Sequence, residues 1–343
     1  MQTTTPKDMK KYLDLALAKK ASDLVLAPGN KPALRINGEI VASSETPLSG
    51  DEINKIALSI ASEQALARID AEGVASIGIA LDDGTIARVN ISRSRGSYSI
   101  GVRFHSGRIH TLKECGVPDA VRELLNAPNG IIAVSGPTGS GKTTTLLSML
   151  DWINENKALH ICTIEQRAVS MITPKKSVVQ QREVGVDVSS MAAGINAALH
   201  QDMDVIMVGE VDNFETVTAC LNAAETGHLV IVQLHASSSS DAIQRLTDAV
   251  PEFMQASVKQ RVAQFLRGVI FQVLARNEGK GGRSAIYEVM VVDDVTRADI
   301  VAGKETLRPG KGSVSLRDEL ARFEREKTVR ADDIASIRAA FVK

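Results

Sequence analysis

The sequence predicts an α/β protein that combines an N-terminal α+β domain with a C-terminal domain built on a mostly parallel sheet. The first observation is size, because 343 residues with 44% hydrophobic content are enough for two domains with substantial cores. The second is that short strand-like runs with glycine turns fill the first hundred residues. The third is that apolar strands alternate with helical patterns after residue 109. We therefore place the domains at 1–108 and 109–343.

The first domain is expected to begin with a packing helix, because residues 7–20 carry apolar side chains at helical spacing between lysines. Two short strands, a helix and an antiparallel three-stranded meander should follow. The strands are expected at 23–26 and 33–40, with turn signals at Pro28-Gly29-Asn30 and Asn37-Gly38, the helix at 50–69, and the meander in ASIGIAL, TIARVNI and YSIGVRF, around Asp82-Asp83-Gly84 and Gly96.

A connector with one short helix is expected over 106–127, because prolines stand inside this segment and just after it. Beyond the connector the order of elements predicts a mostly parallel sheet with helices on both faces. The expected order is strand 130–134, helix 142–154, strands 159–165 and 178–181, helix 189–200, strand 204–210, helix 214–225, strand 228–234, and then helices from Ser239 onward. Helical spacing returns in the polar tail after Gly303, at Leu316, Leu320 and Phe323.

Composition excludes several classes of protein. The net charge of -1, with only 3% aromatic residues, gives neither a basic stripe nor a stacking platform for nucleic acid. No apolar run approaches the ~18 residues of a membrane span, and the N-terminus lacks the apolar core of a signal peptide. Three widely spaced cysteines without a C-x-x-C pair argue against a disulfide framework and a zinc site. We expect a cytoplasmic protein without direct membrane insertion.

The stretch GIIAVSGPTGSGKTTT, residues 130–145, predicts a nucleotide site. It contains the spacing G-x-x-x-x-G-K-T, which wraps backbone N–H groups around phosphates at the start of a helix. In this pattern Lys142 compensates phosphate charge and Thr143 offers a hydroxyl to Mg²⁺. We expect the Lys142 side chain to face solvent when no nucleotide is bound. The predicted phosphate-binding residues are Gly136, Pro137, Thr138, Gly139, Ser140, Gly141, Lys142, Thr143 and Thr144.

Two acids end apolar strands of the predicted sheet. Glu210 ends the run 204–210 and Glu165 ends 159–165, where a P-loop enzyme needs carboxylates to hold water on Mg²⁺ or to polarise the attacking water. The alternative is that both acids are ordinary strand-end residues. His228 and His235 flank the next strand, and a histidine at such a strand end could sense the γ-phosphate or could simply bond backbone.

Arginines are concentrated in the predicted strands of the first domain, including Arg88, Arg95 and Arg103. A solvated sheet face would explain them. The other interpretation is that some reach the triphosphate of a neighbouring subunit, as arginine fingers do.

Taken together, the motifs resemble the PilT/PilU branch of the type II/type IV secretion ATPases, which power retraction of type IV pili in twitching motility. The resemblance spans nearly the whole chain, and the ordered series of motifs is more specific than any one of them. Besides the phosphate loop, the matching segments are ASDLVLAPGNKPALRINGEI near the start, QQREVG at 180–185, DVIMVGE, AAETGHLVIVQLHA and IYEV near 286. A cysteine zinc motif and a longer N-terminal region, usual in pilus-extension relatives, are missing, which favours the retraction branch.

The resemblance implies a PAS-like N-terminal domain, a RecA-like ATPase core, ATP and Mg²⁺ as ligands, and a hexameric ring. It places Glu165 in an aspartate box and assigns Glu210 to an atypical Walker B motif together with Asp204, which would hold Mg²⁺ with Thr143. His228 and His235 fall in a histidine box. It further implies that Arg88, Arg95 and Arg103 contact nucleotide. The implied partners are an inner-membrane pilus platform protein and an active PilT-type relative, at the cytoplasmic side of the inner membrane.

The chain departs from the family pattern in the aspartate box. Where the family usually reads IEDPIE, residues 164–169 read IEQRAV, so Gln166 and Arg167 stand in place of Asp-Pro. Because this neighbourhood has lost negative charge, we expect ATP to bind without brisk turnover. Two alternatives to a retraction motor stay open from the sequence: a weakly active or non-catalytic regulatory relative of such a motor, and a RecA-like nucleic-acid translocase.

Overall fold

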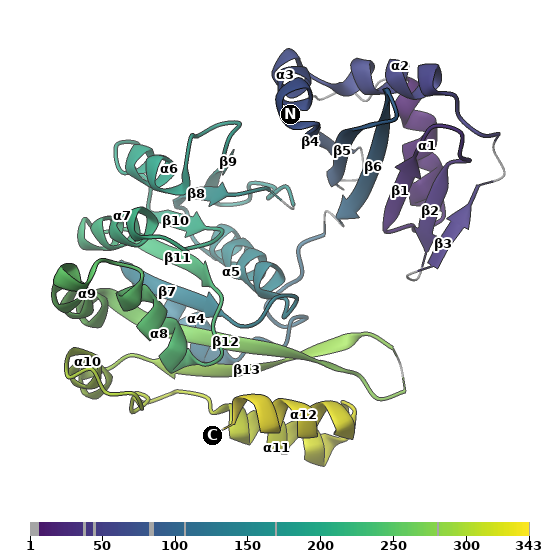
Figure 1. The fold of residues 1–343 in the computed structure, drawn as a ribbon. Helices are drawn as coiled ribbons and strands as arrows, with labels where there is room; N and C mark the ends of the chain where they lie inside the picture. Colours follow the sequence, from purple (N-terminus) through teal and green to yellow (C-terminus); the bar gives the residue numbers. More distant parts are fainter. Residues whose placement is uncertain are drawn as a thin grey trace. The chain divides into compact units, whose positions relative to one another are not determined.

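The computed structural model describes residues 7–36, 39–43, 46–81, 86–105, 108–168, 170–279 and 281–342. Over these residues the chain forms two compact units, Met1–Arg108 with Val169–Met171, and Ile109–Ala168 with Ile172–Lys343 (Figure 1). The turn signals expected at Asn37-Gly38 and at Asp82-Asp83-Gly84 lie outside the described residues. No described helix is both long and apolar enough to cross a membrane.

The first unit is an antiparallel sheet packed against helices. Its strand order is β3-β2-β1-β6-β5-β4, and every described pair in it is antiparallel. The expected three-stranded meander is therefore confirmed as β4, β5 and β6. The elements are α1 (Lys7–Ala18), β1 (Asp23–Leu26), β2 (Ala33–Ile36), β3 (Glu39–Ala42), α2 (Gly50–Ile60), α3 (Glu63–Glu72), β4 (Val74–Ala80), β5 (Ile86–Ser94) and β6 (Ser97–His105).

Two expected elements of this unit are each divided in the structure. The helix expected over 50–69 is two helices, because Ala61 is extended and the Ser62 side chain accepts the Ala65 N–H as the N-cap of α3. The strand expected over 33–40 is also two, since β2 ends at Ile36 and pairs antiparallel with β3. Both corrections come from local breaks that apolar spacing alone does not reveal.

One face of the first sheet is apolar and the other is polar. Leu24, Val102 and Val89 lie opposite one another on neighbouring strands and belong to the core that the helices cover. The adjacent cross-strand row contains Asp23, Arg103 and Arg88. Because successive residues of a strand point to opposite faces, this second row lies on the face away from that core.

The second unit contains a seven-stranded sheet of order β13-β12-β7-β11-β10-β8-β9. Among the strand pairs that the structure describes in this sheet, all are parallel except β12 with β13. The elements are α4 (Asp119–Leu125), β7 (Gly130–Ser135), α5 (Lys142–Asn156), β8 (His160–Glu165), β9 (Val178–Glu183), α6 (Met191–Ala198), β10 (Val205–Val208), α7 (Phe214–Glu225), β11 (Leu229–Leu234), α8 (Ser239–Asp248), α9 (Glu252–Phe265), β12 (Leu266–Arg276), β13 (Arg283–Val291), α10 (Asp294–Val301), α11 (Leu316–Glu326) and α12 (Ala331–Phe341).

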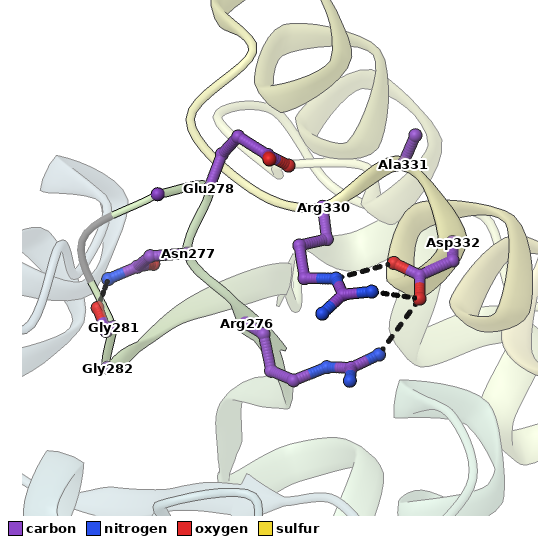
Figure 2. Close-up of a pocket in the computed structure, with 9 residues that line it drawn as sticks. Arg276, Asn277, Glu278, Gly281, Gly282, Arg330, Ala331 and Asp332 are labelled. Carbon is purple, nitrogen blue, oxygen red and sulfur yellow. Dashed lines mark hydrogen bonds and ion pairs between the residues drawn. The ribbon is translucent and has the colours of Figure 1, made fainter.

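The expectation of helices alone after Ser239 is wrong, because β12 and β13 form a long antiparallel hairpin there. The apolar run LRGVIFQVLA in β12 fits a buried strand as well as a helix, and its pairing with β7 decides the matter. Helices α11 and α12 pack on the hairpin through Phe271, Leu320 and Ile334. Near the end of the hairpin, Arg276 and Arg330 both pair with Asp332 (Figure 2).

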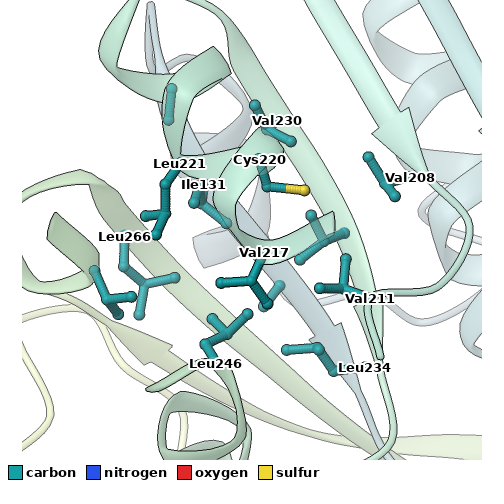
Figure 3. Close-up of a cluster of buried hydrophobic side chains, with 14 of the residues drawn as sticks. Ile131, Val208, Val211, Val217, Cys220, Leu221, Val230, Leu234, Leu246 and Leu266 are labelled. Carbon is teal, nitrogen blue, oxygen red and sulfur yellow. The ribbon is translucent and has the colours of Figure 1, made fainter. Parts of the chain in front are cut away.

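Helices cover both faces of the second sheet, which confirms the predicted α/β architecture. On one face, Ile131 of β7 and Val230 of β11 join a core with α7 and α8 residues such as Val217 and Leu246 (Figure 3). Ile132, the next residue of β7, is fully buried and points to the opposite face, the side on which α5 contacts β7 and β11. The carboxyl ends of β7, β11, β10 and β8 consequently share one edge of the sheet, and that edge carries the candidate site.

Candidate nucleotide site

The phosphate loop joins the buried strand β7 to the start of α5. Gly136, Gly139 and Gly141 have φ values of 144°, 78° and 88°, a region that other residues rarely adopt. A side chain at Gly136 would also be blocked, because its Cβ would lie 2.3 Å from the main-chain oxygen of Gln272. The sequence pattern therefore forms the strand, loop and helix that the nucleotide prediction required.

Lys142 does not face solvent, and that expectation is wrong. Its side chain is 5% exposed, and its Nζ donates hydrogen bonds to the main-chain oxygens of Gly136 and Pro137, each at 2.9 Å. Burial lowers the pKa of the Lys142 ammonium group, while the nearby Glu210 carboxylate opposes that shift. The ammonium group thus points into the loop, where phosphate oxygens would compete with two carbonyls for its protons.

The remaining loop residues divide between surface and interior. Thr138, Gly139 and Thr144 are exposed, Pro137 is half-buried, and Ser140 is buried. The Thr143 hydroxyl donates to Oε1 of Gln233 on β11 at 3.3 Å. Thr143 therefore lies at the edge where β11 ends, beside the lysine that precedes it.

Glu210, His235 and Lys142 form a continuous polar line across three neighbouring strands. Glu210 follows β10, and its Oε1 lies 3.1 Å from Nε2 of His235, which follows β11. The other ring nitrogen of His235, Nδ1, lies 3.4 Å from the Nζ of Lys142, in the first turn of α5 after β7. Three residues that the sequence placed in three separate motifs thus meet at one edge of the sheet.

Glu165 ends β8, the next strand along the same edge. Its side chain is 4% exposed, and its Oε1 accepts a hydrogen bond from the Thr163 hydroxyl at 3.0 Å. Gly209 lets the two strand ends approach closely, because a Cβ at that position would lie 3.2 Å from the Cα of Glu165. Beyond Glu165, Gln166 and Glu210 line one cavity of about 430 Å³ with the first residues of α6 and α7.

Asp204 and His228 lie at the opposite edge of the sheet, which corrects the roles expected for them within one chain. Asp204 precedes β10 and accepts the His160 N–H through Oδ2 at 2.8 Å. His228 precedes β11, and its Nδ1 lies 3.0 Å from the main-chain oxygen of Ala223. Strand β10 has four residues and β11 has six, which span about 13 Å and about 20 Å, so neither side chain reaches a nucleotide or Mg²⁺ held by the phosphate loop of the same chain.

The three candidate arginines belong to the first unit, and their contact with nucleotide stays a prediction. Arg88 on β5 and Arg103 on β6 lie directly opposite each other, the first buried and the second exposed. The Nε of Arg103 donates to Oδ1 of Asp23 at 2.8 Å. Arg95 lies in the turn between β5 and β6 with φ 51°.

Two glutamines contact the phosphate loop without having been singled out in the sequence. Oε1 of Gln233 accepts a hydrogen bond from the Thr143 hydroxyl, and Nε2 of Gln272 on β12 donates to the main-chain oxygen of Ser140 at 2.6 Å. Gln233 could have been found, because it is a polar residue in the apolar strand LVIVQL. Gln272 could not, because it lies 132 residues from Ser140 in a segment that was expected to be helical.

Comparison with known proteins places the chain among secretion and pilus ATPases. Residues 109–332 match the family model described as type II/IV secretion system protein. The chain is 32% identical over 315 residues to the type IV pilus retraction ATPase PilT of Pseudomonas aeruginosa, covering 90% of this chain and 91% of that relative. It is 30% identical over 286 residues to the type IV pilus ATPase PilU of the same organism, covering 83% of this chain and 74% of that relative.

Among solved structures, the crystal structure of the pilus retraction motor PilT with bound ADP superposes on this chain with a TM-score of 0.88 and 34% identity. The superposition covers 95% of this chain and 96% of that one.

Proposed function

Because this chain belongs to the type II/IV secretion system protein family, as a PilT-type member of it, we propose that its phosphate loop binds ATP with Mg²⁺ and that Glu210 is the catalytic carboxylate. As a member of this family the chain is an ATPase and a motor of the pilus retraction class. The observation that carries the site assignment is the line from Lys142 through His235 to Glu210. It connects the phosphate-binding cation to a carboxylate across the ends of β7, β11 and β10.

The residues of the loop fit a triphosphate. The Lys142 ammonium group already satisfies two of its protons with loop carbonyls at 2.9 Å, so phosphate oxygens can replace these acceptors without moving the lysine into a new environment. Backbone N–H groups at the start of α5 add favourable partial charge. When bound, Mg²⁺ would neutralise phosphate charge. The Thr143 hydroxyl, half-buried beside Gln233, is the residue that would ligate it.

Glu210 is suited to orient the water that attacks the γ-phosphate. Its carboxylate is partly exposed, so water can reach it, while His235 holds one of its oxygens at 3.1 Å. His235 also contacts Lys142, so we assign it the role of holding the carboxylate and the phosphate-binding cation at a fixed position relative to each other. Glu165, buried on the next strand, supports this arrangement from the side away from the phosphate loop.

The assembly and partners belong to the same proposal. We place the domain boundary between residues 108 and 109 and expect six copies to form a ring, with Arg88, Arg95 and Arg103 reaching the nucleotide of a neighbouring copy. The ring would act on an inner-membrane pilus platform protein at the cytoplasmic side of the membrane. The similarity to PilT over most of both chains favours the motor over the nucleic-acid translocase and over a purely regulatory relative.

Substitution of Glu210 by Gln tests the catalytic assignment. The amide keeps the size of the side chain but cannot accept a proton or orient water as a carboxylate does, so hydrolysis should slow by ~10²-fold or more while ATP still binds. Steady-state turnover and equilibrium nucleotide binding measure the two effects. Glu123→Gln, at an exposed position of α4 outside the cavity that Glu210 lines, makes the same change in charge and should leave turnover close to wild type. A Glu210→Gln protein that hydrolyses ATP at the wild-type rate would move the catalytic role elsewhere.

A further inference from the structure

Two buried polar residues of the hairpin, Gln272 and Tyr287, lie directly opposite each other on β12 and β13. Each is 1% exposed. Their neighbours along the strands, such as Phe271, Val273 and Ile286, belong to an apolar core. Directly opposed residues of an antiparallel pair point to the same face, so both polar side chains leave the hairpin on one side.

Gln272 donates one hydrogen bond to the phosphate loop and lies close to two of its glycines. Its Nε2 donates to the main-chain oxygen of Ser140 at 2.6 Å. Its own main-chain oxygen fills the space that a side chain at Gly136 would need, and its Nε2 would lie 3.2 Å from a Cβ at Gly141. The side chain thus supports the loop at its closing turn, immediately before Lys142.

Tyr287 contacts the helix that follows the loop. Its hydroxyl donates to the main-chain oxygen of Cys115 at 3.1 Å and lies 3.2 Å from the hydroxyl of Thr145 in the first turn of α5. Thr145 can donate to Tyr287 while Tyr287 donates to Cys115, so one hydroxyl joins α5 to the segment that precedes α4. Burial raises the pKa of Tyr287, which keeps this hydroxyl protonated as a donor.

We propose that Gln272 and Tyr287 act together as a brace that positions the phosphate loop and the first turn of α5 for nucleotide. The proposal rests on the proposed function, that this loop binds ATP. Both are positioning residues: Gln272 on β12 contacts the loop, and Tyr287 on β13 contacts the first turn of α5. The brace would raise the fraction of molecules whose loop is already in the binding conformation, and apparent affinity is proportional to that fraction.

The cost of the arrangement argues against a purely structural role for Gln272. Its Oε1 is buried and has no hydrogen-bond partner among the residues that the structure describes, and the same holds for the Ser140 hydroxyl. An unpaired buried polar atom is destabilising, whereas an apolar side chain of similar shape would avoid that penalty. The feature that an apolar residue could not reproduce is the bond from Nε2 to the loop.

Substitution of Gln272 by Met tests the brace, because Met has similar length and cannot donate. We expect the KM and Kd for ATP to rise about tenfold, equivalent to about 1.4 kcal/mol, with kcat within about twofold of wild type. Bound phosphate would hold the loop once nucleotide is in place, so the chemical step should change little.

Asn154→Leu is the matched control. Asn154 is also a fully buried amide that bonds main-chain groups, at Thr173 and Lys175, but at the far end of α5. It should lower thermal stability without changing KM.

Two further variants keep the proposal testable if Gln272→Met folds poorly. Tyr287→Phe removes only the hydroxyl and should raise KM about threefold, and its effect should not add fully to that of Gln272→Met because both act through one loop. Gln272→Glu retains the shape, and its buried carboxyl should donate to Ser140 only when protonated. Its KM relative to wild type should therefore improve as pH falls, and the Met variant should show no such recovery.

The proposal is overturned if Gln272→Met and Tyr287→Phe lower thermal stability as Asn154→Leu does and leave KM unchanged. Lys142→Ala separates this result from failure of the proposed function. If Lys142→Ala abolishes ATP binding while the brace variants bind normally, only the brace is wrong. If Lys142→Ala also binds ATP normally, the loop is not the nucleotide site and both proposals fall.

Discussion

At the scale of single residues, the chain differs from the family pattern directly after Glu165, where Gln166 and Arg167 replace the usual Asp-Pro. Gln166 and Arg167 are exposed, whereas Glu165 is buried against Thr163. Gln166 lines the same cavity as Glu210, so a change of charge there acts close to the proposed catalytic carboxylate. A cation that strengthens binding of ground state and transition state equally does not raise kcat.

We predict that Gln166→Asp combined with Arg167→Pro raises kcat by ~10-fold, about 1.4 kcal/mol of barrier, with little change in ATP affinity. The added carboxylate would extend the polar network that positions Mg²⁺ and water. Single-turnover and steady-state kinetics measure this. Gln166→Asn with Arg167→Lys keeps a neutral amide and a cation and should give no increase. If the wild type already hydrolyses ATP rapidly and the double substitution lowers kcat, Gln166 and Arg167 support activity and have not reduced it.

At the scale of elements, the hairpin β12–β13 is held to α12 by an ion-pair cluster. The main-chain N–H of Arg276 donates to Oδ2 of Asp333 at 2.6 Å, and the Nε of Arg276 lies 3.1 Å from both carboxylate oxygens. Hydrogen bonds from the Arg276 side chain lower the pKa of Asp333 to about 2. Because the folded-state pKa lies below the usual value, Asp333 contributes stability above about pH 4, and this contribution is lost as pH falls toward 2.

Asp333→Asn should accordingly lower the melting temperature at neutral pH by roughly 2–4 °C, the shift expected for loss of one well-oriented ion pair in a unit of this size. The difference in melting temperature between wild type and variant should become smaller as pH falls from about 4 to 2, since the wild-type carboxylate is then protonated and, like the amide, carries no charge. Thermal melts followed by circular dichroism across this range measure this difference. Glu324→Gln, which removes the exposed pair of Glu324 with Arg338, is the control and should shift the melting temperature less. If the difference in melting temperature between wild type and Asp333→Asn stays constant down to pH 2, protonation of Asp333 is not the cause of the pH dependence.

At the scale of the whole molecule, the proposed ring separates the parts of one nucleotide site between neighbouring copies. Arg103 lies in the first unit and pairs there with Asp23, while Lys142 lies in the second. If Arg103 acts on a neighbouring copy, a chain that lacks Arg103 and a chain that lacks Lys142 should complement each other.

Arg103→Ala and Lys142→Ala should each be nearly inactive alone, and a mixture in equal amounts should regain activity. Random mixing in a head-to-tail ring leaves about a quarter of the interfaces with both residues intact. ATP turnover of the mixture measures the recovery. Mixing Lys142→Ala with the double variant Arg103→Ala/Lys142→Ala is the control, because it contains no intact phosphate loop and should stay inactive. No recovery, together with monomeric light scattering in the presence of ATP, would count against action between subunits.

The sequence alone determined the features that depend on neighbours along the chain. The strand, glycine loop and helix around Lys142 are contiguous, so spacing sufficed to predict the phosphate loop. Alternation of strands and helices predicted the parallel sheet, and the ends of its strands correctly placed Glu210 and His235 at one edge.

Tertiary structure alone decided what depends on contacts distant in sequence. It decided the contacts of Asp204 and His228: the Asp204 carboxylate accepts the main-chain N–H of His160, and Nδ1 of His228 lies beside the main-chain oxygen of Ala223. It also buried Lys142, because the ammonium group bonds loop carbonyls that only the folded loop brings within reach. Strand pairing is a contact between remote segments, so the periodicity of β12 could not reveal its place beside β7 or the approach of Gln272 to Ser140.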